Sequence, residues 1–347
     1  MLAVSLRPLR RMRQRFDFTI VLAGVLVCSI PLASQSKRPL RANPALPPVV
    51  VPHGNPQTAA KVELGRQLYF DPRLSADDTI SCATCHAPET AWANHDQVDT
   101  GIRGRTGTRN SGTILDAAYM KFQFWDGRAT SLEEQALGPI HNPVEMGETL
   151  EHVVRKLRAI EGYRTQFSAV FGTDVTTDGI AKAIAAFERT VLSGPSPYDR
   201  FMSGDNTAMS VAAQRGLQIF NGKGGCHACH QGPLFSDQSF HNIGVGMDRP
   251  DPDIGRQAVT NDPADRGKFK TPTLRNVALT WPYLHDGSAP DLNAVIELYD
   301  RGGVPNPTLD DRIKPLGLTN EEQQDVVEFL QALTGTLPDL NRPALPR

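Results

Sequence analysis

The residues with the clearest chemical potential are two cysteines separated by two residues and followed directly by a histidine. This arrangement occurs twice, as Cys82-Ala83-Thr84-Cys85-His86 and as Cys226-His227-Ala228-Cys229-His230. Two thiols at this spacing can add to the two vinyl groups of one porphyrin, and the histidine can then ligate its iron. One copy alone could be a thioredoxin-like redox pair or half of a zinc site. Two copies predict two covalently bound c-type haems.

The remaining cysteine and the N-terminal residues indicate an exported protein. Of five cysteines, the one outside the two motifs is Cys28, in the apolar run from Thr19 to Ala33. Five arginines precede this run, and Leu32-Ala33-Ser34 resembles a cleavage site. Because the run is short for a membrane span, we expect a periplasmic protein with a cleaved signal peptide. A retained N-terminal membrane anchor is the less favoured alternative.

Composition and charge fit a globular protein with no affinity for nucleic acid. The chain has 347 residues, 39% hydrophobic and 21% charged, which suits two domains of ordinary size. Without residues 1–34 it holds 31 basic and 37 acidic residues, a net charge of about −6. This acidic balance argues against nucleic acid as a partner.

An amphipathic segment precedes each cysteine–histidine motif. The two segments are Leu64-Gly65-Arg66-Gln67-Leu68-Tyr69-Phe70 and Arg215-Gly216-Leu217-Gln218-Ile219-Phe220. Each predicts a helix that leads through a loop to the motif, so the chain contains an internal repeat. Further helices are expected at 149–171, at 178–192 and after Thr319, where Glu322 completes a capping box. Strand signals are sparse, and we expect a mainly α fold with two cytochrome c-like haem domains packed against each other.

The composition along the chain predicts five segments. A signal peptide at 1–34 and a Pro-rich linker at 35–56, which we expect to be an extended tether outside the core, precede the first haem domain at 57–194. The second haem domain is expected at 195–337, followed by a tail at 338–347. The boundary is placed in the Ser-, Gly- and Pro-rich stretch 193–197.

With both haem motifs in place, the chain resembles the bacterial di-haem cytochrome c peroxidases, and within them the MauG branch. The resemblance covers roughly residues 58–335. Its further motifs are Phe124-Trp125-Asp126-Gly127-Arg128, Asn142-Pro143-Val144-Glu145-Met146-Gly147 and Tyr299-Asp300-Arg301-Gly302-Gly303. It implies a peroxide site at the N-terminal haem and an electron-transfer role for the C-terminal haem.

The resemblance assigns catalytic roles to three residues. Glu145 matches the acid–base that moves a proton between the two oxygens of peroxide, and a carboxyl beside an apolar face would have the raised pKa this needs. Gln135 matches a glutamine that hydrogen-bonds in the same pocket. Trp125 matches the indole that lies between the haems and relays electrons. Trp92 and Trp281 are left as core or surface residues.

The expected iron ligands depart from the ordinary peroxidases. His86 and His230 are the proximal ligands. The distal histidine of the ordinary members would fall at Ile102-Arg103, where this chain has none. The resemblance therefore implies a five-coordinate N-terminal haem, although His95 on the same loop could still swing in.

The C-terminal haem and a calcium ion complete the expectations from the resemblance. Ordinary members have a methionine as the distal ligand of the C-terminal haem, whereas MauG has a tyrosine there. Tyr299 stands at this position in the present chain. Met247 and His285 are rival ligands. A phenolate should favour ferric and higher oxidation states. Asn110, Thr280 and Pro282 match calcium ligands, and oxygen donors suit this ion.

Three functions are weighed. The first is a MauG-like enzyme that reacts with hydrogen peroxide and oxidises an aromatic residue of a partner protein by long-range electron transfer. The second is a cytochrome c peroxidase that reduces hydrogen peroxide to water with electrons from a small redox protein, a cytochrome c or a cupredoxin. The third is a non-catalytic electron carrier, against which Glu145 and Gln135 argue.

Overall fold

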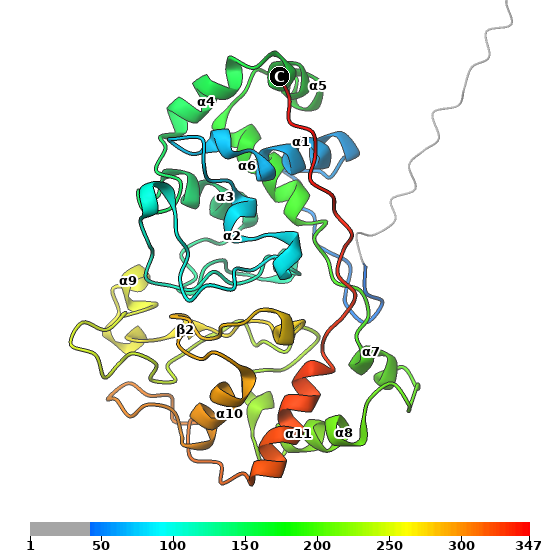
Figure 1. Cartoon of the computed structure of the whole chain (residues 1–347), viewed down its shortest axis with the longest axis vertical. Helices are drawn as coiled ribbons and strands as arrows, with labels where there is room; N and C mark the ends of the chain where they lie inside the picture. Colours follow the sequence, from blue (N-terminus) through cyan, green and yellow to red (C-terminus); the bar gives the residue numbers. More distant parts are fainter. Residues whose placement is uncertain (1–41) are drawn as a thin grey trace, which may run out of the picture. The chain divides into compact units, whose positions relative to one another are not determined.

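Helices form nearly all of the regular structure in residues 42–347, the part of the chain that this computed structural model describes (Figure 1). The first half contains α1 (Ala59–Phe70), α2 (Cys82–Cys85), α3 (Leu132–His141), α4 (Leu150–Arg158), α5 (Glu161–Phe171) and α6 (Thr177–Glu188). The second half contains α7 (Pro197–Met202), α8 (Val211–Asn221), α9 (Gln257–Thr260), α10 (Leu292–Asp300) and α11 (Asn320–Gln331). The predicted signal peptide and Cys28 lie outside the described residues.

Short elements complete the described chain. The 3₁₀ helices are η1 (Pro72–Leu74), η2 (Pro88–Thr90), η3 (Ile102–Gly104), η4 (Ala117–Tyr119), η5 (Cys226–Ala228), η6 (Pro263–Asp265) and η7 (Val277–Leu279). Strands β1 (Phe240–His241) and β2 (Phe269–Lys270) pair antiparallel, with Phe240 opposite Lys270. The prediction of a mainly α fold with few short strands is therefore confirmed.

The same close helix crossing occurs once in each half. A Cβ atom on Gly65 of α1 would lie 1.8 Å from the carbonyl oxygen of Ala183 in α6. A Cβ atom on Gly216 of α8 would lie 1.8 Å from the carbonyl oxygen of Asp325 in α11. Only glycine permits this approach of two backbones, and the crossing fixes the helix that leads to each cysteine–histidine motif. The internal repeat in the sequence is thus a repeat in the structure.

A second repeated feature is a tight turn before α3 and before α10. Bridges close the turns 123–129 and 283–289. Gly127 and Gly287 occupy equivalent places in them, with φ of 68° and 63°, in the left-handed region that favours glycine. Because the turns superpose in register, Trp125 in the first half is the counterpart of His285 in the second.

Main-chain hydrogen bonds join the two halves. The Lys270 N–H in β2 donates to the Trp125 carbonyl oxygen at 2.7 Å, and the Asn110 N–H donates to the His285 carbonyl oxygen at 2.8 Å. Each half has its own hydrophobic cluster, while residues 39–347 form one compact unit. The boundary near residue 194 stays a prediction.

The described part of the Pro-rich segment is not a free tether. It forms no helix or strand before α1, as its composition predicts. However, Leu46 and Val49 are 2% and 7% exposed, and the Asn43 amide donates to Asp199 at 2.7 Å. Prolines favour an extended backbone but do not prevent neighbouring side chains from packing. The expectation that this segment lies outside the core is corrected for these residues.

The C-terminal tail returns to the first half of the chain (Figure 1). Arg66 in α1 donates to the Asn341 carbonyl oxygen at 2.6 Å. Arg73 donates to the Pro346 carbonyl oxygen at 3.1 Å, and the Gly162 N–H donates to the Arg347 carbonyl oxygen at 3.0 Å. The tail therefore connects the helix that ends the second half to α1 and α5.

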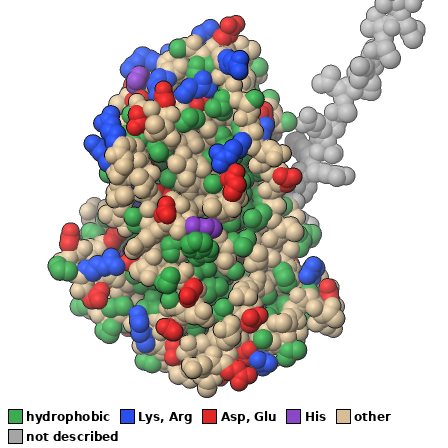
Figure 2. All heavy atoms as spheres, in the orientation of Figure 1, with side chains coloured by type: hydrophobic (Ala, Val, Ile, Leu, Met, Phe, Trp, Pro, Cys, Tyr) green, Lys and Arg blue, Asp and Glu red, His purple; other side chains and the backbone are tan. Residues whose placement is uncertain are grey.

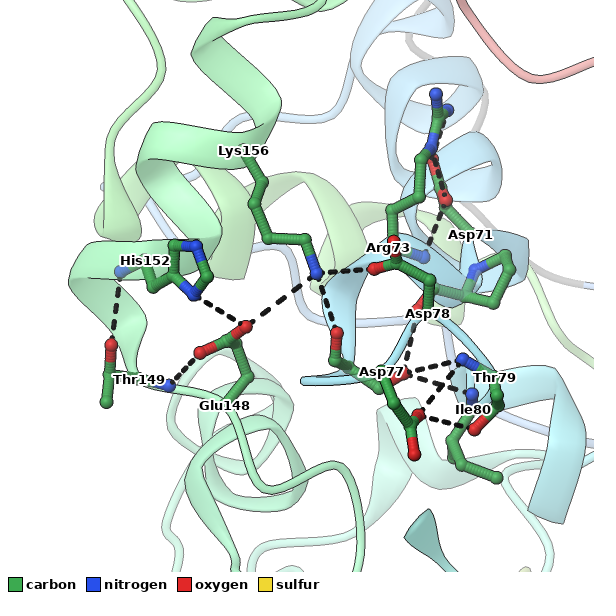
Figure 3. Close-up of polar contacts among 12 residues, drawn as sticks. Asp71, Arg73, Asp77, Asp78, Thr79, Ile80, Glu148, Thr149, His152 and Lys156 are labelled. Carbon is green, nitrogen blue, oxygen red and sulfur yellow. Dashed lines mark hydrogen bonds and ion pairs between the residues drawn. The ribbon is translucent and has the colours of Figure 1, made fainter. Parts of the chain in front are cut away.

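A polar network holds the loop that leads to the first motif (Figure 3). Lys156 in α4 donates to the Ser75 carbonyl oxygen at 2.7 Å and pairs with Asp78. The buried Glu148 lies 3.7 Å from Lys156 and 2.9 Å from His152. These contacts attach the loop before Cys82 to a helix of the first core.

The surface carries both signs of charge. On the face in Figure 2, acidic and basic side chains are interspersed, with hydrophobic side chains between them. The exposed large hydrophobic residues are Val50, Met202, Val211, Val259, Trp281 and Leu337. Among residues 42–347, no helix has both the length and the apolar character needed to cross a bilayer.

Replacing Gly65 with alanine should strongly destabilise the first half. The new methyl group would overlap the Ala183 carbonyl oxygen, and we expect a loss of about 3 kcal/mol in the free energy of unfolding. Denaturant unfolding of the holoprotein measures it. Gly54→Ala is the matched control, since nothing lies within 4 Å of an added Cβ there. Equal stability of the two variants would contradict the crossing.

Candidate functional site

One cavity of about 470 Å³ collects the residues that the sequence singles out. Its wall includes both cysteine–histidine motifs and every other predicted catalytic, iron-ligating or calcium-ligating residue. These residues are Cys82, Cys85, His86, Asn110, Trp125, Gln135, Glu145, Cys226, Cys229, His230, Thr280, Pro282 and Tyr299. The structure thus brings together, from distant parts of the sequence, all the groups expected to serve two haems. Their individual roles stay predictions.

The first motif forms one turn of helix, α2, that presents its histidine to the cavity. Ser81 and Thr84 form a capping box, in which the Ser81 N–H donates to the Thr84 hydroxyl at 2.9 Å. The Tyr69 hydroxyl donates to the His86 carbonyl oxygen at 2.8 Å. The His86 ring is buried, which lowers its pKa, and its Nδ1 has no hydrogen-bond partner. A neutral imidazole is the form that ligates a metal.

The second motif orients its histidine more firmly. Cys226 to Ala228 form a 3₁₀ turn, η5, and the His230 Nδ1 donates to the Phe235 carbonyl oxygen at 2.8 Å. This bond leaves Nε2 for the cavity and favours the tautomer that a metal needs. Burial lowers the pKa of His230. Both histidines therefore fit the role of a proximal haem ligand.

The thiols do not have the character of a redox-active pair. Burial raises the pKa of Cys82 to about 12 and that of Cys226 to about 11. A reactive dithiol instead has a lowered pKa, in an electropositive and partly exposed site. The buried thiols beside a mostly apolar cavity fit covalent attachment of a porphyrin.

Glu145 and Gln135 face the cavity from the region of α3. Gln135 lies in the helix, and Glu145 lies in the turn after it, where the Asn142 amide donates to the carboxyl at 2.6 Å. Burial raises the pKa of Glu145. The Ile102 N–H donates to the Glu145 carbonyl oxygen at 2.9 Å. The place where ordinary peroxidases have a distal histidine is thus adjacent to Glu145.

His95 is held away from the cavity. Its Nε2 donates to the Leu279 carbonyl oxygen at 3.1 Å, and its ring stacks on Trp281 with centroids 4.0 Å apart. Neither His95 nor Trp281 lines the cavity. In this conformation the His95 ring is held by Leu279 and Trp281 outside the cavity wall, and a ligand role for it stays a prediction.

Trp125 lies on the cavity wall where the halves meet. Its indole N–H donates to the Asn110 carbonyl oxygen at 2.8 Å, and its own carbonyl oxygen accepts the bond from Lys270. The other two tryptophans are elsewhere: Trp92 is fully buried and Trp281 is 44% exposed. The arrangement suits an indole that is fixed between two cofactors.

Tyr299 faces the second motif from the last turn of α10. Burial is the main cause that raises its pKa, and the thiols of Cys226 and Cys229 add to this rise, so the phenol lies near them. Of its rivals, Met247 does not line the cavity. His285 does, but its ring stacks on Phe269 at 3.7 Å.

The predicted calcium ligands gather where the two halves meet. Asn110, Thr280 and Pro282 all line the cavity. The Asn110 amide nitrogen donates to the carbonyl oxygens of Asp96 and Gln97 at 3.2 and 3.3 Å. The amide oxygen of Asn110 therefore points away from these two carbonyl groups, as it must in order to act as a calcium ligand. Calcium at this place stays a prediction.

Several charged residues of the cavity wall were missed by the sequence analysis, among them Lys270 and Glu188. Lys270 lines it, and burial lowers its pKa to about 8. Glu188 lines it at the end of α6. Glu188 directly follows Phe187, which belongs to an apolar helical stripe. A carboxylate beside this stripe was the signal that could have marked Glu188 as a site residue. No such signal marks Lys270.

Comparisons with known proteins show the family of this chain. Residues 59–207 match the family model described as di-haem cytochrome c peroxidase. The cytochrome-c peroxidase IdrP1 of Denitromonas iodatirespirans is 39% identical across 94% of this chain and 96% of its own length. The methylamine utilization protein MauG of Methylorubrum extorquens is 40% identical across 86% of each chain.

A solved structure gives the same answer for the fold. A MauG-like protein associated with microbial copper homeostasis matches with a TM-score of 0.78 and 34% identity, over 84% of this chain and 94% of that one. The chain therefore belongs to the family of di-haem cytochrome c peroxidases and MauG proteins, and it is a haem-dependent oxidoreductase with two c-type haems.

Proposed function

We propose that this enzyme is MauG-like: it reacts with hydrogen peroxide in the first half of the cavity and oxidises an aromatic residue of a partner protein by long-range electron transfer. The observation that carries the proposal is the pairing of Tyr299 with the second motif, together with the absence of a histidine from residues 102–103 beside Glu145. In this proposal the first pocket would leave room for peroxide beside Glu145, and the phenol of Tyr299 would be available to bind the second haem.

Glu145 is the proposed acid–base. Cys82, Cys85 and His86 would hold the first haem, which would supply the iron for cleavage of the O–O bond, and the two haems together would supply the two electrons that this cleavage needs. Glu145 would take a proton from one oxygen of the peroxide and deliver it to the other, which would leave as water. Burial raises the pKa of this carboxyl, which favours a group that can both accept and release a proton. Gln135, on the same wall, orients the peroxide by hydrogen bonding.

Trp125 is the proposed relay, because its backbone and indole are bonded to both halves. An electron that leaves the second half for the first passes through this indole. With the second haem bound, a phenolate from Tyr299 would favour its oxidised states, so that an oxidising equivalent would be stored in this half. The partner protein then supplies the electrons from an aromatic side chain.

The relatives support this class of partner without naming it for this chain. Two are named methylamine utilization protein MauG, and the solved MauG-like structure is associated with copper homeostasis. We propose a protein substrate or a small redox protein, a cytochrome c or a cupredoxin, in the periplasm. The export-like N-terminus and covalent haem attachment support that compartment.

A second function is favoured by a specific observation. The relative that covers 94% of this chain is named a cytochrome-c peroxidase, as is the cytochrome c551 peroxidase of Nitrosomonas europaea at 39% identity. Under this alternative, a small cytochrome c reduces the enzyme and hydrogen peroxide becomes water.

Adding hydrogen peroxide to the fully oxidised holoprotein separates the two functions. We expect a long-lived state two equivalents more oxidised, formed without prior reduction, because no histidine has to leave the first haem. Stopped-flow absorbance measures its formation and decay. Fast steady-state turnover with reduced cytochrome c, seen only after one-electron reduction of the enzyme, would contradict the MauG-like proposal.

Replacing Glu145 with glutamine should slow the reaction with peroxide by about 10²-fold or more. Glutamine keeps the shape of the side chain but cannot carry the proton. In the unsubstituted enzyme the rate constant should rise with pH through the raised pKa of Glu145, since the carboxylate is the base, and E145Q should lose this rise. Stopped-flow kinetics across pH measures both.

The matched control is Glu151→Gln, an exposed carboxylate at the start of α4. It should leave the rate constant and its pH dependence unchanged. If E145Q retains the rate of the control, the assignment of Glu145 as acid–base is wrong.

A further inference from the structure

The first half of the cavity contains a carboxyl group that the proposed mechanism does not use. Glu188, at the C-terminal end of α6, is 3% exposed and lines the cavity. Its Oε2 is buried and has no hydrogen-bond partner among the described residues. An unpaired buried carboxylate is costly, so such a group is held in its protonated form or paired with a bound cofactor.

The neighbours of Glu188 do not neutralise it. The adjacent Arg189 donates to both carboxylate oxygens of Glu133 in α3 at 2.8 Å, so its charge is already paired. Tyr69 in α1 and Cys82 in α2 are the other titratable groups that interact with Glu188. No group of α4 shifts its pKa. Burial dominates and raises the pKa of Glu188 to about 8, with Arg189 lowering it and Glu133 raising it.

The internal repeat shows that the second half lacks this carboxyl group. An added Cβ on Gly65 would approach Phe187, and one on Gly216 would approach Phe329 in the same way, at 3.0 and 2.9 Å. In this register the counterpart of Glu188 is Leu330, which also lines the cavity. Equivalent positions on the cavity wall therefore hold a carboxyl group in one half and an aliphatic side chain in the other.

We propose that Glu188 is a proton-carrying acid of the first haem pocket, which binds a proton when this pocket gains an electron and releases it when the electron leaves. The electron comes from the redox partner and the proton from water, so each one-electron reduction is balanced by one proton. The second pocket, with Leu330 in this place, has no such coupling there. The inference rests on the two-haem family and holds for either function above.

The physical basis is the charge of a buried pair. An added electron makes the haem more negative, and a carboxylate close to it in a medium of low dielectric then has a higher pKa. Because the reduced state binds more protons, its stability relative to the oxidised state falls as pH rises. Glu188 thus makes the first haem pH-dependent in the range where the carboxyl group titrates, and it distinguishes the two haems.

Redox titration of the holoprotein at a series of pH values, followed by electron paramagnetic resonance to resolve the haems, tests this proposal. Above about pH 8 the reduction potential of the first haem should fall as pH rises. The slope should approach about 59 mV per pH unit, which corresponds to a tenfold change in the one-electron reduction equilibrium. E188Q and E188L should remove this dependence, and E188L recreates the residue of the second half. The control Glu151→Gln should retain it, and the second haem should not share it.

An infrared difference spectrum of the unsubstituted protein provides a readout that needs no variant. Near pH 8 to 9, reduction should produce the carbonyl band of a protonated carboxyl group, and E188Q should lack this band. If the pH dependence of the first haem persists in E188Q and E188L, or if the unsubstituted protein shows neither the dependence nor the band, the proposal is wrong.

Discussion

The structure depends on filling one apolar cavity shared by both halves. The cavity of about 470 Å³ is lined largely by apolar side chains, and leaving such surface exposed to water would be unfavourable. The haems are therefore part of the hydrophobic core, and covalent attachment through Cys82, Cys85, Cys226 and Cys229 keeps them there. The helix crossings at glycine and the hydrogen bonds around Trp125 define the space that the haems fill.

Function arises from the differences between two copies of one structural unit. Both copies have the same helix crossing, the same motif and the same tight turn, but they differ at several cavity positions, including the following three. The first half has Trp125, Pro139 and Glu188 where the second has His285, Tyr299 and Leu330. A shared scaffold thus supplies two similar pockets with different side chains on their walls. Under the proposed function, these differences suit one pocket to reaction with peroxide and the other to storing an oxidising equivalent.

Features that depend on neighbouring residues could be predicted from the sequence. The two haem motifs, the helices that precede them and the Thr319 cap are examples, because spacing along a helix determines what their side chains can reach. Glu145 could be assigned by resemblance, and its position beside Ile102 appears only when the chain folds. The burial of Leu46 could not be predicted, since a Pro-rich composition specifies an extended backbone but not what it packs against. Lys270 was missed because only distant segments make its surroundings apolar.

The proposed function requires that the iron of the first haem has a free coordination position and that Tyr299 is a ligand of the second haem iron. An electron paramagnetic resonance spectrum of the oxidised holoprotein tests it most directly. The account predicts one high-spin and one low-spin ferric signal, with the low-spin signal altered in Tyr299→Phe and unchanged in a variant of His95. Two low-spin signals, or a low-spin signal insensitive to the loss of the phenol oxygen, would contradict it.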